Sequence, residues 1–348
     1  MSSNMAQIDN EIIKFLRENP LSSSPEIHKG IGKGSYATVK RVIANLLEAG
    51  QIVSEGQRRA TRYQVSPANE VLGPIDMSAY FEKEIDGRDI REGFNFQLIR
   101  ETLAKINIFT VEEANTLRQM QKEFRDNIAH MSADVYNKEM ERLAIDLSWK
   151  SSQIEGNTYS LLETERLLKD KETAEGKPKD DATMLLNHKE ALNFIIDDPD
   201  YLVPLTISRI EDIHSILVKD LPVERNIRQR RVGISGTNYR PLENEHQIRE
   251  ALEDMCELIN SKEDVFEKSL LALVLLSYIQ AFNDGNKRTA RIISNAILIA
   301  NQYCPISFRT IDSVEYKKAM LIFYEQNNIS VFKEIFIEQF KFAVKTYF

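Results

Sequence analysis

The sequence predicts a mainly α-helical protein built in two parts. Apolar residues recur at helical spacing along most of the 348 residues, and no regular alternation of strands and helices is visible. The whole chain has 45 Lys and Arg against 53 Asp and Glu, but residues 1–66 carry nine against six. We therefore expect a small, slightly basic domain at residues 1–66, in front of a larger acidic and helical body.

The first part of the chain contains signals for three helices. Apolar residues four, seven and eight positions apart predict a helix over 7–19, which Pro20 ends. Serines followed by Pro25 begin a second helix that reaches Ile31, and Ser35 is placed to cap a third helix. Glycine at position 50 ends that third helix.

A hairpin follows these helices and completes a recognisable order. Short strand-like runs at 51–53 and 61–65 flank a turn that contains Gly56. Three helices and a hairpin in about 65 residues resemble the winged helix-turn-helix of transcriptional regulators, which implies DNA as a partner of residues 1–66. A role in protein contacts is the alternative. The basic residues that support DNA binding fall in the third helix region and the hairpin: Lys33, Lys40, Arg41, Arg58, Arg59 and Arg62.

The rest of the chain divides into a linker and two helical parts. Residues 67–93 contain several prolines and glycines and are expected to be a linker, with helical parts at 94–200 and 201–348. The one strand-like exception is 231–239, which predicts a small hairpin set into the helical body. Cys256 and Cys304 lack partners at metal-ligand spacing, so neither a structural zinc site nor a disulfide framework is expected.

The cellular setting is also an expectation from sequence. The N-terminus lacks the pattern of a signal peptide, and no apolar run approaches the ~18 residues needed to cross a bilayer. We therefore expect a cytoplasmic protein without a membrane partner. The sequence leaves a homodimer open.

The segment 270–300 carries the strongest chemical signal. It contains an apolar helix, a short polar turn that includes Asp284 and Gly285, and a second helix. A glycine turn at a helix N-terminus presents free N–H groups to an anion, and one carboxylate beside phosphate oxygens suits Mg²⁺. Arg288 and Arg291 are placed to clamp phosphates. These residues predict a metal–nucleotide phosphate site, with a solvated turn between helices as the plain alternative.

The same residues closely resemble the signature of the Fic/Doc family, H-x-F-x-(D/E)-G-N-(G/K)-R-x-x-R. The matching residues are Phe282, Asp284, Gly285, Asn286, Lys287, Arg288 and Arg291. Residues 151–157 are similar to the family's inhibitory motif, and 231–241 are similar to the hairpin flap that docks the target segment. The resemblance covers about residues 95–348. It implies a helical Fic domain with a small β-hairpin flap, and transfer of AMP from ATP, with Mg²⁺, to a Ser, Thr or Tyr hydroxyl of a protein, which includes the chain itself.

The resemblance also implies a role for each matching position. Asp284 would hold Mg²⁺, Gly285 and Asn286 would form the anion cradle, and Arg288 would contact phosphates. Lys287 is also expected to bind the nucleotide. Arg291 would hold the γ-phosphate or, in the closed state, pair with Glu155. Asn295 is expected to reach the ribose or base. The remaining implied residues are the inhibitory Ser151, Glu155 and Gly156, and the target-docking Ile234, Ser235, Gly236 and Thr237.

Two departures from the family pattern leave the activity open. The family's histidine, which takes the proton of the target hydroxyl, falls at Gln280, and an amide has no usable basicity near pH 7. Lys287 stands where glycine is commonest and is shared with the Doc branch, which transfers a phosphoryl group. We therefore consider an autoinhibited, impaired adenylyltransferase first, with an ATP-binding pseudoenzyme that regulates through DNA, or a Doc-like phosphotransferase, as alternatives.

Overall fold

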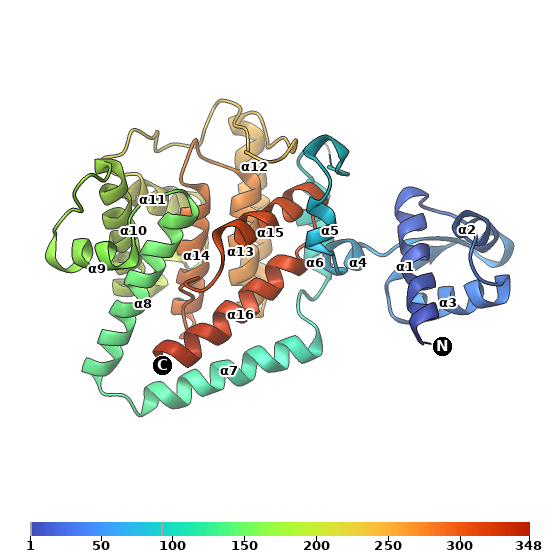
Figure 1. The fold of residues 1–348 in the computed structure, drawn as a ribbon, viewed down its shortest axis with the longest axis horizontal. Helices are drawn as coiled ribbons and strands as arrows, with labels where there is room; N and C mark the ends of the chain where they lie inside the picture. The colour runs from blue at the N-terminus through green and yellow to red at the C-terminus, as the bar shows by residue number, and fades with distance from the viewer. Residues whose placement is uncertain (1, 92) are drawn as a thin grey trace. The chain divides into compact units, whose positions relative to one another are not determined.

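The computed structural model describes residues 2–91 and 93–348, without the side chains of residues 2–7 and of Arg59. Within these ranges the protein is mainly α-helical, with one two-stranded sheet, and this confirms the predicted fold class (Figure 1). The chain forms two compact units. The first unit runs to Ile75 and takes in Asn327–Ser330, and the second comprises Asp76–Gln326 and Val331–Phe348.

The first unit contains three helices followed by a hairpin. Its helix starts are fixed locally: the Ser35 hydroxyl accepts a hydrogen bond from the Thr38 N–H, as expected for a cap. The hairpin pairs Ile52 with Val65, and both side chains are buried in the unit's core. The elements are α1 (Ser2–Glu18), α2 (Ser24–Ile31), α3 (Tyr36–Glu48), β1 (Ile52–Glu55), β2 (Arg62–Val65) and α4 (Pro67–Leu72).

The segment predicted as a linker, 67–93, holds more local structure than a flexible connection would. It contains α4, α5 and a 3₁₀ turn at Ile85–Gly87, and the division between the two units falls inside it, between Ile75 and Asp76. Ser66 caps α4 by accepting a hydrogen bond from the Asn69 N–H, and Asp76 caps α5 in the same way. The residue types that suggested a loop therefore mark the ends of short helices.

The second unit is a helical assembly around one buried pair of helices. No helix in the described ranges is long and apolar enough to cross a membrane. Three irregular or short turns accompany the helices, at Ile85–Gly87, Leu98–Thr102 and Pro199–Leu202. The helices are α5 (Met77–Phe81), α6 (Leu103–Lys105), α7 (Val111–Ala129), α8 (Ala133–Ile154), α9 (Leu161–Asp170), α10 (Lys179–Asp197), α11 (Ile207–Leu217), α12 (Glu245–Ser261), α13 (Val265–Ile279), α14 (Asn286–Ala300), α15 (Ser313–Gln326) and α16 (Ser330–Tyr347).

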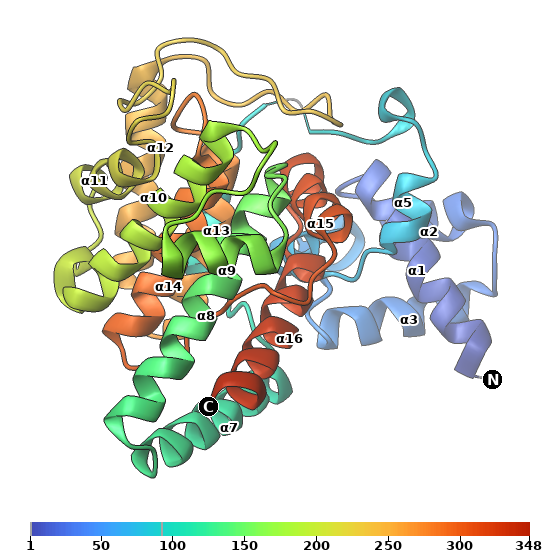
Figure 2. The same cartoon turned by 60° about the vertical axis from the view of Figure 1, so that its left-hand side comes forward.

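Helices α13 and α14 form the centre of this unit. Every residue of α13 from Leu270 to Ile279 is buried, as expected for a helix that is apolar on all sides. The two helices run side by side, and α8, α10, α11, α12 and α15 pack around them (Figures 1 and 2). The polar turn between α13 and α14 is therefore held at both ends by the most deeply buried helices of the protein.

The hairpin predicted at 231–239 is corrected by the structure. A turn forms at Ser235–Gly236, but no strand pairing forms on either side of it. Arg228 holds the two ends of this segment together in place of a strand ladder. Its guanidinium, fully buried, donates to the carbonyls of Arg230 and Leu242 at 2.8 and 2.6 Å. We call residues 231–241 the flap segment.

Replacing Arg228 tests how strongly it anchors the flap segment. Its Nε also donates to the carbonyl of Gln280 at 2.6 Å, so the change Arg228→Met leaves three carbonyls without this donor. We expect a loss of about 2–4 kcal/mol in the free energy of unfolding, because each orphaned polar group costs about 1–3 kcal/mol and relief of a buried charge offsets part of it. Urea unfolding followed by the fluorescence of Trp149, the single tryptophan, which lies on α8, measures this value for the second unit.

Arg231→Met is the matched control for this measurement. Arg231 is three residues away, and its side chain is 75% exposed. Its replacement should leave the transition almost unchanged. Equal midpoints for the two variants would show that Arg228 does not anchor the flap segment.

Candidate active site

The turn between α13 and α14 closes around the side chain of Asn286. The Asn286 Oδ1 accepts from the Phe282 N–H at 2.8 Å, and its Nδ2 donates to the Phe282 carbonyl at 2.7 Å. Gly285 precedes α14 with φ of 81°, a backbone conformation that favours glycine. The first N–H groups of α14 have no acceptor within the helix, so they face the turn with the positive end of the helix dipole.

His214, on α11, supports this turn from below and was not predicted from the sequence. Its ring stacks on Phe282 with 3.6 Å between centroids, and its ring nitrogens lie 3.0 Å from the carbonyls of Asp284 and Arg225. A Cβ at Gly285 would lie 3.3 Å from the His214 Nε2, so this tight approach also favours glycine. Burial lowers the pKa of His214. No sequence signal joined His214 to a motif 70 residues away.

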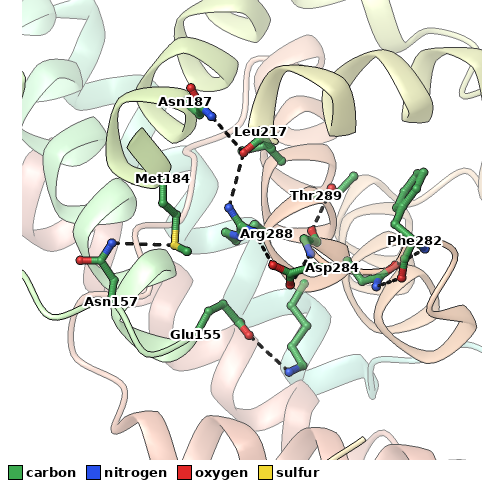
Figure 3. A network of polar contacts seen from close by, with 12 residues as sticks. Glu155, Asn157, Met184, Asn187, Leu217, Phe282, Asp284, Arg288 and Thr289 are labelled. Atoms are coloured by element: carbon green, nitrogen blue, oxygen red, sulfur yellow. Dashed lines mark hydrogen bonds and ion pairs between the residues drawn. The ribbon is translucent and has the colours of Figure 1, made fainter. Parts of the chain in front are cut away.

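Arg288 places a buried positive charge beside an exposed carboxylate (Figure 3). Its side chain is 1% exposed, and it contacts the Asp284 Oδ2 at 3.2 Å and the Leu217 carbonyl at 3.5 Å. The Nε of Arg288 is buried without a hydrogen-bond partner among the described residues. Asp284 itself is 64% exposed, so its carboxylate remains accessible to a further ligand.

Arg291 brings the predicted inhibitory residues to the same helix. Its Nε donates to the Ser151 hydroxyl at 2.8 Å, and its Nη2 donates to the Ser151 carbonyl at 2.9 Å and to the Glu155 carboxylate at 2.7 Å. Its guanidinium lies over the ring of Tyr316 at 5.3 Å. The Nη1 of this completely buried arginine has no hydrogen-bond partner in the described part of the chain.

Glu155 occupies an electrostatically unfavourable place that its two cationic partners compensate. It caps the C-terminal end of α8, where the helix dipole disfavours a negative charge. Its carboxylate contacts Arg291 and, at 3.3 Å, the ammonium of Lys287 (Figure 3). Burial alone would raise the pKa of Glu155, but Arg291 and Lys287 hold it below its usual value, so Glu155 is ionised at neutral pH. The next residue, Gly156, has φ of 101° and reverses the chain.

The charges around the turn suit a phosphate ligand. Three cations, Lys287, Arg288 and Arg291, face two carboxylates, and two buried guanidinium N–H groups lack acceptors among the described residues. No group of three or more metal-ligating side chains occurs in the described ranges. Because Mg²⁺ binds through one or two carboxylates plus phosphate oxygens, Asp284 fits it only in company with a phosphate.

Gln280 ends α13 in a left-handed conformation, with φ of 53° and ψ of 55°. Its side-chain amide is engaged at both ends: the Nε2 donates to the Ser277 carbonyl at 2.6 Å, and the Oε1 accepts from Asn286 at 3.2 Å. An amide has no proton affinity near neutral pH, so Gln280 orients groups but does not act as a base.

A cavity of about 300 Å³ opens above this turn. It is lined by the predicted residues Glu155, Gln280 and Lys287 and by Ile234 and Ser235 of the flap segment. We call it the motif cavity. None of the described histidines lines it. Sequence reasoning missed its opposite wall, which α15 contributes and whose only sequence signal is helical periodicity. The residues missed are Gly233 of the flap segment and, on α15, Tyr316, Lys317, Met320, Leu321 and Tyr324.

The tyrosines of this wall stay protonated. Burial raises the pKa of Tyr316 and raises the pKa of Tyr324 well above its ordinary value. Neither hydroxyl finds a hydrogen-bond partner of good geometry among the described residues, although both are buried. The two hydroxyls therefore do not act as bases near neutral pH.

Three predicted site residues take other roles in the structure. Asn295 is completely buried, and its side chain bonds the backbone N–H and carbonyl of Ile306. Gly236 forms the turn of the flap segment with φ of 89°, and Thr237 accepts a hydrogen bond from the Tyr239 N–H. Neither of these two lines the motif cavity.

Comparisons with known proteins identify this region. Residues 204–298 match the sequence model of the Fic/DOC family. Protein adenylyltransferase Fic of Nematostella vectensis is 28% identical over 183 residues, 48% of this chain and 40% of that protein. Protein adenylyltransferase fic-1 of Caenorhabditis elegans is 26% identical over 205 residues, 56% of this chain and 39% of that protein. The chain thus spans about two fifths of the length of these curated relatives.

Solved structures show the same fold at low sequence identity. A fragment of Fic-1 from Caenorhabditis elegans has a TM-score of 0.59 and 19% identity, over 68% of this chain and 72% of that one. A Fic domain containing signaling protein from Bacteroides thetaiotaomicron has a TM-score of 0.58 and 19% identity, over 66% of this chain and 94% of that one. The turn and helix built around Asp284, Gly285 and Arg288 lie within the residues that match the Fic/DOC family model, and the surrounding fold resembles that of these Fic structures.

Proposed function

We propose that this protein binds ATP with Mg²⁺ in its Fic domain and transfers AMP to a protein hydroxyl, slowly and under inhibition by Glu155. The observation that carries the proposal is the pair of buried guanidinium groups at the start of α14, Arg288 and Arg291, each with an N–H that lacks an acceptor among the described residues. Buried donors without acceptors are costly, and phosphate oxygens supply acceptors of matching geometry. The curated relatives named above are protein adenylyltransferases.

In this reaction the target's hydroxyl oxygen attacks the α-phosphorus of ATP, and the bond from that phosphorus to pyrophosphate breaks. The N–H groups at the start of α14 and Arg288 stabilise the charge on the phosphates. Asp284 would hold Mg²⁺, which neutralises phosphate charge when it is bound. The hydroxyl proton has no basic acceptor at Gln280, and the loss of a general base costs a factor of about 10²–10⁴ in rate.

Inhibition follows from competition for the same cations. The carboxylate of Glu155 pairs with Arg291 and Lys287, and Glu155 and Lys287 both line the motif cavity. Two anions cannot share these partners without repulsion. A nucleotide must therefore displace Glu155 or bind without the contact to Arg291.

Nucleotide affinity tests this competition. We expect Glu155→Gly to tighten the binding of ATP·Mg²⁺ about tenfold, within the usual range of coupling energies, because it frees Arg291 and Lys287. Adding Lys287→Gly should then weaken binding more than Lys287→Gly does in the wild-type chain, where Glu155 already engages that lysine. Isothermal titration of the full chain measures all four affinities.

Glu172→Gly serves as the control, since it removes an exposed carboxylate from a loop that does not line the motif cavity. It should leave the affinity unchanged. Equal affinities for the wild-type chain and Glu155→Gly would refute the competition, and no heat from any variant would refute nucleotide binding itself.

Restoring the base tests the chemistry. We expect Gln280→His in the Glu155→Gly background to raise self-modification by about 10²–10⁴-fold, the usual gain from general-base help. Incorporation of ³²P from α-labelled ATP measures AMP transfer, and γ-labelled ATP measures phosphoryl transfer in parallel. Gln280→Asn keeps an amide and should give no gain.

The two labels also separate the alternatives. Incorporation from γ-labelled ATP alone would favour the phosphotransferase that Lys287 resembles. Absence of both labels in the Gln280→His, Glu155→Gly chain, with nucleotide still bound, would favour a nucleotide-binding pseudoenzyme over a latent transferase.

A second function, binding of DNA by the winged helix-turn-helix predicted at residues 1–66, is favoured by the charges of the first unit. Lys40 on α3 and Arg58 between the two strands are exposed and have no acidic partner among the described residues. Two other predicted basic residues, Lys33 and Arg62, are paired with carboxylates of the same unit. The spacing of the free charges over a helix and a hairpin tip suits contacts to phosphates.

The salt dependence of DNA binding tests this second function. We expect the full chain to bind a labelled random-sequence duplex, and the Lys40→Ala, Arg58→Ala chain to bind it more weakly with a salt slope lower by about two, since each phosphate contact contributes about 0.9. Lys14→Ala, an exposed charge on α1 outside this surface, should change neither quantity. Binding that ignores Lys40 and Arg58 would indicate a protein partner instead.

A further inference from the structure

A second cavity lies along the other half of the flap segment. It has a volume of about 500 Å³, and its lining includes Arg88, Arg91 and Arg240, with Asp86 and Asn238. It does not share a lining residue with the motif cavity. We call it the arginine cavity.

Arg88 is built into the wall of this cavity. Its side chain is 7% exposed, and its Nη1 donates to the buried carboxylate of Glu325 at 3.0 Å. Tyr80 donates its hydroxyl to the same carboxylate at 2.5 Å, and burial with this contact raises the pKa of Tyr80, so the hydroxyl stays protonated. The Nε of Arg88 is buried without a hydrogen-bond partner in the described part of the chain. A rigid guanidinium with an unfilled donor therefore borders the cavity.

Among its described lining residues, the arginine cavity has three arginines and one carboxylate. The carboxylate among its described lining residues, that of Asp86, accepts a hydrogen bond from the Asn238 Nδ2 at 2.8 Å. Arg240 is exposed and makes no ion pair with any described residue. Arg91 donates its backbone N–H to the Glu325 carbonyl, which fixes its place at the rim. Guanidinium groups in such a setting bind a carboxylate through paired N–H donors.

The flap segment connects this cavity to the reacting centre. Its residues Gly233, Ile234 and Ser235 line the motif cavity, whereas Asn238 and Arg240 line the arginine cavity. Helix α15 makes the same connection, because Tyr324 lines the first cavity and Glu325 holds Arg88 in the second. An extended peptide laid along the flap segment would cover three to five residues between the two, at about 3.3 Å each.

We propose that the arginine cavity binds an acidic side chain, Asp or Glu, of the target protein, three to five residues from the hydroxyl that is modified. The proposal rests on the proposed function for the identity of that hydroxyl, but the cavity and its charge stand without it. Binding there would select targets by an acidic residue at a fixed distance and would hold the hydroxyl at the motif cavity.

Peptide binding tests the proposal without any transfer chemistry. The probe is a fluorescein-labelled peptide with a central serine and glutamates three, four and five residues away on both sides, with glycine between. The control peptide has glutamine at those six positions. Fluorescence anisotropy with the full chain, without ATP, should show about tenfold tighter binding of the glutamate peptide, as expected for one charge-assisted bidentate pair.

Matched variants locate the interaction. Arg240→Ala should remove the preference for glutamate. Arg231→Ala replaces another exposed arginine of the flap segment, outside the arginine cavity, and should retain the preference. Arg240 is exposed, so its replacement leaves the core intact, and urea unfolding read by Trp149 verifies this.

The outcomes separate this proposal from the proposed function. Equal binding of the two peptides, or a glutamate preference that survives Arg240→Ala, overturns the arginine cavity whatever the transfer assay shows. A preference that depends on Arg240 supports it even if no variant transfers AMP, and in that case only the proposed function fails.

Discussion

One buried cation, Arg228, holds the active region of this protein together. Its guanidinium donates to the carbonyls of Arg230, Leu242 and Gln280, and so joins both ends of the flap segment to the last residue before the motif turn. No carboxylate neutralises it in the contacts described, and burial lowers the pKa of Arg228. Charge-assisted hydrogen bonds offset the cost of its desolvation. The hydrogen bond from Arg228 to the Gln280 carbonyl also holds Gln280 in a left-handed conformation, which is uncommon for a non-glycine residue.

The turn that follows Gln280 also requires an anion. Arg288 and Arg291 bring two positive charges into the interior at the positive end of α14, and the carboxylates that contact them in the described ranges are the partly exposed Glu155 and the exposed Asp284. Glu155 sits at the wrong end of its own helix for a negative charge, so its stability there depends on Arg291 and Lys287. The carboxylate of Glu155 and a nucleotide phosphate then compete for the same cations. A change that weakens the binding of one anion strengthens the binding of the other.

Sequence patterns predicted what is local in the chain. The helix ends, the caps at Ser35, and the hairpin at 52–65 follow from neighbouring residue types, and the glycine at 285 follows from the turn it makes. Contacts between segments far apart in the sequence could not be predicted from these patterns. His214 beneath Phe282 and Tyr316 beneath Arg291 carry no motif, and the bonds of Asn295 to Ile306 depend on how the chain returns after α14. The strands expected in the flap segment are absent because a side chain, that of Arg228, replaces their ladder.

Gln280 keeps the hydrogen bonds of the site in place although it cannot act as a base. Its amide donates to the Ser277 carbonyl and accepts from Asn286, so both of its polar atoms are engaged and neither is basic. The turn therefore keeps its hydrogen bonds with glutamine in place, and with them the position of the N–H groups that face an anion. What the amide cannot reproduce is proton affinity. The residues that bind phosphate and the residue that would take the proton are thus separable in this protein, and the geometry preserves the first independently of the second.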